Sequence, residues 1–187
     1  MPAKKQISKE AILQAALEIV RECGLSAVNA RNIAKKLHCS TQPIYLSFTG
    51  MDELKTAVSQ MIDQEYDLFV KKHIDSSNYV VSKAKAHVLF ALYEKNLYTA
   101  MFLSNTLEGI SFEDIANAEW NQKVISSIMA DFNIDRPYAQ KIFIEIWLLS
   151  SGLAIELATN KMKINETDIH LLLSEFYERM KNYYAKK

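Results

Sequence analysis

Residues 29–48 read NARNIAKKLHCSTQPIYLSF, and this stretch holds two short helical patterns joined by a turn. Asn29 is a suitable N-cap for the first helix, and Ser40 is a suitable N-cap for the second. Apolar residues recur at helical spacing in both patterns, at Ile33, Ala34, Leu37, Ile44 and Phe48. This arrangement is typical of a helix-turn-helix, whose second helix enters the major groove of DNA.

The second helix of this pair begins with side chains that suit contact with DNA. The hydroxyls of Ser40 and Thr41 bond phosphates or base edges, and the amide of Gln42 pairs with adenine. Pro43 is tolerated in the first turn of a helix and offers an apolar surface to a thymine methyl. We expect the Tyr45 hydroxyl to bind phosphate. The alternative is that Ser40 is only a cap and that Tyr45 belongs to the core.

Positive charge is concentrated in the N-terminal part of the chain. The 22 basic and 22 acidic residues give a formal net charge of zero, which by itself argues against a nucleic-acid-binding domain. Residues 1–50, however, carry seven basic and three acidic residues, a net charge of +4, which leaves −4 for the rest. Such an asymmetry favours an interaction with nucleic acid. Within this part, Arg31 is either a contact to phosphate or a base, or a solvated surface charge.

Glycine and proline are rare, with four and three occurrences in 187 residues. Since β-sandwiches and barrels place these residues in frequent turns, neither architecture fits. Hydrophobic residues at 49% and charged residues at 24% exclude a disordered chain. The composition therefore predicts a folded, all-α protein.

Helical patterns cover the rest of the chain. Ser8 is a suitable N-cap for a first helix that ends at Gly24. Beyond the quoted stretch we expect helices over residues 51–74, 79–95, 96–106, 113–132, 135–160 and 166–184. The expected organisation is a three-helix helix-turn-helix domain at residues 1–50 and a larger helical domain at residues 51–187.

The N-terminal motif resembles a known family. The pattern G-x4-N-x3-I-A-x10-Y-x2-F-x5-L is similar to the N-terminal domain of tetracycline-repressor-type (TetR family) transcriptional regulators, and it is carried by Gly24, Asn29, Ile33, Ala34, Tyr45, Phe48 and Leu54. The likeness covers about residues 8–58 and continues weakly at residues 147–154, which resemble part of the family's dimerisation helix. By this resemblance, Asn29 and Arg31 lie near the DNA backbone. The residues implied on the recognition helix are Thr41, Gln42, Pro43, Tyr45 and Ser47.

The resemblance implies a transcriptional regulator, a repressor released from a palindromic DNA operator by a small-molecule effector. Two departures from the family pattern are visible. The residues His38, Cys39 and Ser40 stand where the family usually has Gly-Val-Ser, so the turn glycine is absent. Met51 replaces a usual lysine that contacts phosphate, which leaves Lys55 or the helix N-terminus for that contact.

Two C-terminal patterns suit a homodimer interface, since a dimer of such domains reads two half-sites about 34 Å apart. The segment 166–184 has an apolar stripe formed by Ile169, Leu172, Leu173, Phe176, Met180 and Tyr183. The segment 135–160 has small residues where a partner helix approaches closely, at Ser150, Ser151, Gly152 and Ala154. The alternative is that these stripes face the chain's own core.

The resemblance also implies an effector pocket in the C-terminal domain. Apolar walls with a few polar groups are the usual lining of a small-molecule site. The candidate ligand-binding residues are His87, Phe90, Tyr93, Tyr98, Phe102, Asn105, Trp120 and Trp147. Packing in the core is the alternative for each aromatic residue, and the sequence does not identify the ligand.

Motifs of catalysis and metal binding are absent from the sequence. None of the four histidines follows an acidic residue by three positions, no Cys/His pair has zinc spacing, and no glycine-rich phosphate loop occurs. We therefore expect no enzyme activity, no cofactor and no metal. The alternative function is a helical ligand-binding or adaptor protein whose N-terminal helices bind protein.

The sequence also predicts a cytoplasmic protein. The first ten residues, MPAKKQISKE, lack the apolar segment of a signal peptide. The most apolar uncharged run, residues 146–155, is about half the ~20 residues that a membrane span requires. Cys23 and Cys39 are too few for a disulfide framework.

Overall fold

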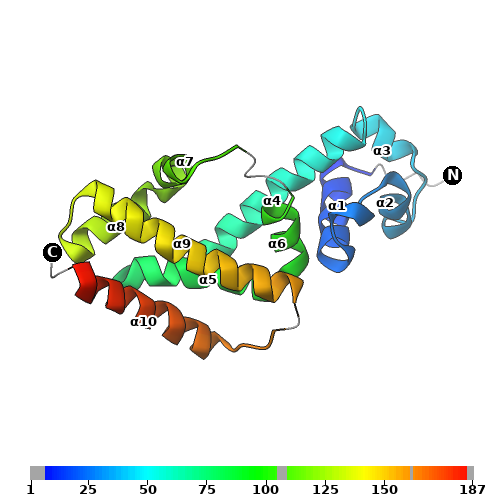
Figure 1. Cartoon of the computed structure of the whole chain (residues 1–187). Helices are drawn as coiled ribbons and strands as arrows, with labels where there is room; N and C mark the ends of the chain where they lie inside the picture. The colour runs from blue at the N-terminus through cyan, green and yellow to red at the C-terminus, as the bar shows by residue number, and fades with distance from the viewer. Residues whose placement is uncertain (1–6, 105–108, 161, 185–187) are drawn as a thin grey trace. The chain divides into compact units, whose positions relative to one another are not determined.

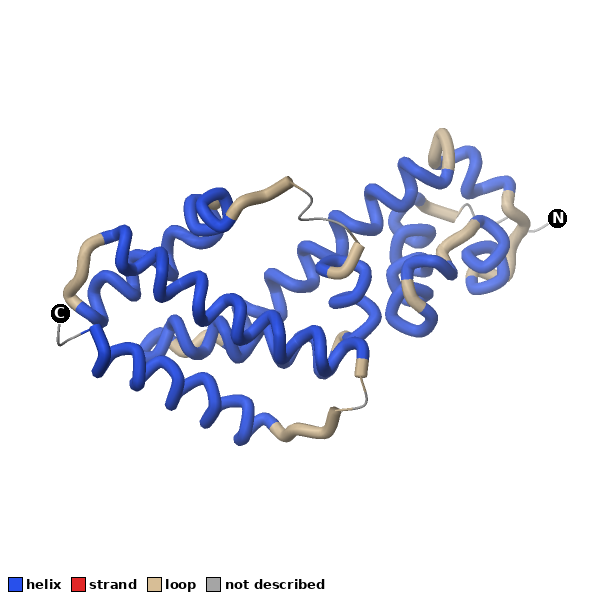
Figure 2. The backbone as a smooth tube through the Cα atoms, viewed as in Figure 1, coloured by secondary structure: helices blue, strands red, loops and turns tan. Residues whose placement is uncertain are grey.

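The computed structural model describes residues 7–104, 109–160 and 162–184. Within these residues the chain forms ten α-helices and three short 3-10 helices, and it contains no strand (Figures 1 and 2). The prediction of an all-α fold is confirmed.

The described residues form two compact units. The first contains residues 7–67 and 94–104, and the second contains residues 68–93, 109–160 and 162–184. This division differs from the boundary expected at residue 50. The difference arises because residues 51–67 of helix α4 (Met51–His73) and helix α6 (Lys95–Phe102) belong with the N-terminal helices.

Helix α1 (Lys9–Cys23) has the limits that its capping residues predict. The Ser8 hydroxyl accepts a hydrogen bond from the backbone N–H of Ala11 at 3.2 Å. Gly24 ends the helix with a φ of 81°, a left-handed value that favours glycine. The buried face of α1, which includes Ile12 and Leu17, packs against α2, α3 and α6.

Helices α2 (Ala30–Lys36) and α3 (Gln42–Ser47) are joined by residues 37–41. Asn29 caps α2, as expected, by accepting from the N–H of Asn32 at 2.9 Å. The expected cap of α3 at Ser40 is wrong, because the N-cap is Thr41, whose side chain makes no capping bond. The turn is made instead by His38, which adopts a left-handed φ of 51° at the position where the resembled family has glycine.

The second unit is a helical bundle with one hydrophobic core. Helix α9 (Arg136–Thr159) lies alongside α5 (Tyr79–Tyr93), α8 (Gln122–Phe132) and α10 (Glu166–Tyr184), as Figure 1 shows. Its buried residues include Ile142 and Ile146, which pack with Leu89 of α5 and Leu173 of α10 in the same cluster. The predicted limits of α5, α9 and α10 agree with the structure to within two residues.

The helix expected over residues 113–132 is two helices, α7 (Phe112–Asn117) and α8, separated by a 3-10 turn (Glu119–Asn121). Ala118 is extended, with φ −56° and ψ 139°. The Asn121 amide donates to the carbonyl of Ile115 at 2.9 Å, and the Gln122 amide donates to the carbonyl of Asn117 at 2.9 Å. These side chains replace the backbone bonds that a continuous helix would have made.

One helix among the described residues, α9, is long and apolar enough to cross a membrane by length and composition alone. A core helix passes the same test, and α9 buries Ile142, Ile146 and Ala154 inside the bundle.

Candidate nucleic-acid interface

Helix α3 divides sharply into a buried and an exposed side. Ile44 and Phe48 are 1% and 3% exposed, which confirms that they belong to the core. Tyr45 and Leu46 are 59% and 79% exposed. The alternative that Tyr45 is a core residue is therefore wrong, and its ring is available to a partner.

The other residues predicted to contact DNA lie on or next to this exposed side. Ser40 and Gln42 are exposed, and the partly exposed residues are Thr41, Pro43 and Ser47. The sequence interpretation missed Leu46. Its position four residues after Gln42 places both on one face of α3, and this spacing could have identified it.

Exposed basic residues lie on the helices that precede and follow α3 in the chain. Arg31 and Lys35 on α2, and Lys55 on α4, are exposed, and within the described ranges none of the three forms an ion pair. Lys36, by contrast, pairs with Glu18 at 3.2 Å and Glu22 at 2.8 Å. Three positive charges on the helices that flank α3 in the chain are thus free to meet an anionic partner.

Both polar atoms of the Asn29 side chain form hydrogen bonds with backbone groups nearby in the chain. Its carbonyl oxygen accepts from Asn32, and its amide nitrogen donates to the carbonyl of Ala27 at 3.3 Å. The structure gives Asn29 a role in capping α2. Its predicted position near the DNA backbone is consistent with its exposure, but the capping bonds already occupy both polar atoms.

The start of α4 is fixed by Glu53. Its carboxylate accepts hydrogen bonds from the N–H and the hydroxyl of Thr49, both at 2.8 Å, and pairs with Lys9 at 3.2 Å. These contacts lower the pKa of Glu53 to about 2. Lys9 also lies over the ring of Phe48, 4.5 Å from its centroid. The end of α3 is thereby joined to α1 and α4.

The residues predicted to line an effector pocket are distributed over both units. In the second unit, His87 and Phe90 are buried on α5, and Phe90 contacts Phe69 edge to face at 5.3 Å. Burial lowers the pKa of His87 to about 4, with a smaller contribution from the positive charge of Lys83. His87 is therefore neutral at pH 7.

In the first unit, Tyr98 and Phe102 of α6 form an aromatic cluster with Tyr66 of α4. The Tyr98 and Phe102 rings lie 4.8 Å apart, and those of Tyr66 and Phe102 lie 5.2 Å apart. Tyr98 is 1% exposed, which favours the core alternative for this residue.

Two of the predicted pocket residues face solvent instead. Trp120 and Tyr93 are 77% and 58% exposed, which does not fit the lining of an enclosed site. The Tyr93 hydroxyl donates to the carboxylate of Glu166 at the start of α10. Trp147 is partly buried, with its ring 6.4 Å from that of Phe112. Asn105 lies outside the described residues.

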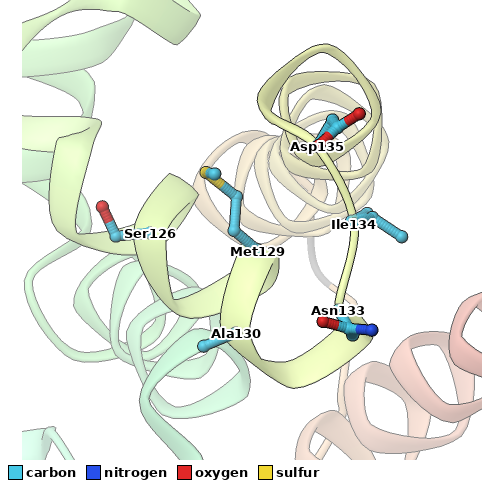
Figure 3. Close-up of a pocket in the computed structure, with 6 residues that line it drawn as sticks. All are labelled: Ser126, Met129, Ala130, Asn133, Ile134 and Asp135. Carbon is cyan, nitrogen blue, oxygen red and sulfur yellow. The ribbon is translucent and has the colours of Figure 1, made fainter.

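A surface pocket of about 420 Å³ lies at the connection between α8 and α9 (Figure 3). It is lined by Ser126, Met129, Ala130, Asn133, Ile134 and Asp135. None of the seven described residues that were predicted to bind an effector lines this pocket. Among the described residues, no group of three or more His, Cys, Asp or Glu side chains is placed to hold a metal ion.

The two segments predicted to form a dimer interface contain both core and exposed residues. Ser150 and Ala154 are buried, as are Ile169, Leu173 and Met180, so these five face the chain's own core. The exposed surface of the two helices is mixed. Leu148 and Ile155 on α9 and Leu171 on α10 are 46%, 39% and 50% exposed, and charged residues such as Glu145, Glu156 and Glu175 are exposed as well. A Cβ added at Gly152, between Leu148 and Ile155, would meet nothing within 4 Å.

Comparisons with family models and curated proteins identified no relative of this chain. No protein-family model matches the chain, and no curated protein matches it.

Proposed function

We propose that the chain is a DNA-binding transcriptional regulator in which α2 and α3 act as a helix-turn-helix. The observation that carries the proposal is the exposed side of α3, where Gln42 and Tyr45 face solvent while Ile44 and Phe48 hold the helix in the core. A helix held from one side by apolar contacts presents its other side to a groove. Arg31, Lys35 and Lys55 form no ion pair with any described residue, which supports contact with phosphate.

The proposal can be tested by measuring how the affinity for DNA depends on salt concentration, because phosphate contacts weaken as salt rises. Each phosphate neutralised by a basic side chain releases counterions, so the logarithm of affinity falls linearly with the logarithm of salt concentration, with a slope of about −0.9 per contact. An apolar protein partner would give a much weaker dependence.

The experiment begins with selection of bound fragments from a random DNA pool by the full chain. A fluorescently labelled selected fragment is then titrated between 50 and 200 mM salt, that is, over roughly the range in which such contacts weaken strongly. We expect Arg31→Gln to reduce the magnitude of the salt slope by about 1. The matched control is Lys163→Gln, an exposed charge in the connection before α10, which should leave the slope unchanged.

Two results would contradict the proposal. One is that no fragment is enriched and random DNA is bound no better than a neutral polymer. The other is that affinity is independent of salt, which would favour an adaptor protein that binds another protein through these helices.

We further propose that the regulator is a homodimer formed through the exposed sides of α9 and α10. Support comes from Leu148, Ile155 and Leu171, and from Gly152, whose open surface allows close approach of a second helix. Ile155→Glu should produce a monomer in sedimentation equilibrium, whereas Lys141→Glu, an exposed charge reversal on the same helix, should not. A wild-type chain that is monomeric at all concentrations would contradict this part.

A small-molecule effector that binds the second unit is the remaining part of the proposal. By linkage, an effector that weakens operator binding must itself bind more weakly, by the same factor, when the operator is present. Fluorescence anisotropy of the selected operator, measured against a panel of small molecules, tests this part. If no compound that binds the protein changes operator affinity, the effector part fails while DNA binding stands.

A further inference from the structure

Leu46 is the most exposed of the large hydrophobic side chains that the structure describes, at 79%. It lies on a helix of six residues whose other aliphatic residue, Ile44, is 1% exposed. A single exposed leucine is ordinary on a protein surface. This one, however, lies on the face of α3 that also carries Gln42.

Gln42 and Leu46 are four positions apart in α3 and are both exposed. Residues at this spacing are neighbours on a helix surface, about 5–6 Å apart between Cβ atoms. Successive bases on one strand of DNA are about 3.4 Å apart along the axis. Two such side chains therefore reach bases that are the same or within about two positions of each other.

In the major groove, Gln42 and Leu46 suit different bases. An amide such as that of Gln42 bonds adenine through N6 and N7. An aliphatic side chain has one specific target on a base edge in this groove, the C5 methyl of thymine. Adenine and thymine are partners in one base pair. A short run of A·T pairs therefore offers an adenine to Gln42 and a thymine methyl to Leu46.

We infer that Leu46 contacts a thymine methyl and that Gln42 contacts an adenine within two base pairs of it. Leu46 then acts as a specificity-determining residue of the DNA half-site. This inference rests on the proposed function and names the bases that the same surface selects.

Charge favours DNA over a protein as the occupant of this face. No acidic residue occurs between Glu22 and Asp52, a stretch that contains α2, the turn and α3. The same stretch holds Arg31 and Lys35, which are exposed and form no ion pair within the described part of the chain. The segment that carries Leu46 therefore has a positive net charge, which suits a partner bordered by phosphates.

The test is a cycle that combines a protein change with a change in the DNA. Thymines in the selected operator are replaced one at a time by deoxyuridine, which removes only the methyl group. With the wild-type protein, we expect one position in each half-site to lose about fourfold in affinity, the effect of removing one buried methyl group. Leu46→Ala should weaken binding to the unmodified operator and be insensitive to deoxyuridine at that position alone.

Adenines are probed in the same way with 7-deazaadenine, which removes the N7 acceptor. Gln42→Ala should abolish the sensitivity of one adenine, and that adenine should lie within two base pairs of the thymine that Leu46 senses. Leu68→Ala is the matched control, since Leu68 on α4 is 62% exposed and should change neither pattern.

The possible failures are distinguishable. If Leu46→Ala binds the operator tightly and keeps the full sensitivity to every deoxyuridine, the inference is overturned while DNA binding remains. If the selection enriches no DNA, the proposed function fails first. A wild-type complex that is insensitive to deoxyuridine at every position also overturns the inference, and this result does not depend on how any variant folds.

Discussion

The guanidinium of Arg21 on α1 donates through Nε to the carboxylate of Glu94, at 3.3 Å, at the N-cap of α6. The same guanidinium also pairs with Glu65 of α4. The amide of Asn96 donates to the backbone carbonyl of Arg21 at 2.7 Å. One arginine therefore joins three helices, and it explains why α6 belongs with the N-terminal helices although seventy residues separate it from α1.

Replacing Arg21 should loosen the first unit. Arg21→Met keeps much of the apolar stem but leaves Glu65 and Glu94 without their cation, and we expect a loss of about 1–2 kcal/mol in the free energy of unfolding. Urea denaturation followed by circular dichroism measures it. Lys55→Met, which removes an exposed cation without an ion pair among the described residues, should cost less than about 0.5 kcal/mol. Equal losses in the two variants would show that the bridge is not stabilising.

The hydroxyl of Tyr177 on α10 donates to the carboxylate of Asp131 on α8 at 2.8 Å, and the Tyr177 side chain is 5% exposed. Tyr177→Phe removes this bond but keeps the contact of the ring with Phe132. We expect a loss of about 0.5–1.5 kcal/mol in the free energy of unfolding. Tyr138→Phe, at an exposed position on α9, is the control. If the variant were as stable as the wild type, water would solvate the Asp131 carboxylate as favourably as the Tyr177 hydroxyl does.

The buried His87 should make stability depend on pH. Its pKa is about 4 when folded and 6.5 in its ordinary state, so between these values the unfolded chain binds more protons. Stability from this residue is complete above pH 6.5 and is lost as the pH falls toward 4, by at most about 1.4 kcal/mol per unit.

The measurement is guanidinium denaturation at a series of pH values for the wild type and His87→Phe. The variant should show a smaller decrease in stability between pH 6.5 and 4.5 than the wild type does. Identical pH profiles would mean that His87 titrates normally in the folded protein.

Glu53 should also make stability depend on pH, in the same direction as His87 but at lower pH. Its pKa is lowered from 4.5 to about 2 by the Thr49 bonds and Lys9, so its contribution is complete above pH 4.5 and disappears as the pH falls toward 2. Glu53→Gln should lower the melting temperature at pH 6, and the difference from the wild type should shrink at pH 2.5. A difference that does not change with pH would assign the effect to amide geometry and not to charge.

Local capping signals were the part of the fold that the sequence predicted best. Ser8, Gly24 and Asn29 each act on backbone groups within a few residues, so α1 and the start of α2 follow from short-range chemistry alone. The break between α7 and α8 was missed because helical periodicity continues through it. The competing bonds from Asn121 and Gln122 to backbone carbonyls depend on geometry that the pattern of apolar residues does not contain.

The DNA-binding candidates were predicted better than the pocket candidates, again because the sequence pattern does not report how helices pack. Residues on α3 were identified from their chemistry, and their exposure agrees with it. Trp120 and Tyr98 are both large aromatic residues in the part of the sequence expected to form a pocket. In the structure Trp120 is 77% exposed and Tyr98 is 1% exposed. Exposure depends on which helices pack together, and the side chain type alone does not report that. The exposed Leu46 was overlooked because an apolar residue in a helix is usually assigned to the core.

The left-handed His38 has a consequence for the unfolded chain. Glycine would adopt this conformation without strain, but it also has the largest number of unfolded conformations to lose. Histidine costs of order 1 kcal/mol of backbone strain at a positive φ and recovers about 0.4–1 kcal/mol because its unfolded state is more restricted. At a positive φ the strain outweighs the smaller loss of unfolded conformations, so His38→Gly should stabilise the turn between α2 and α3.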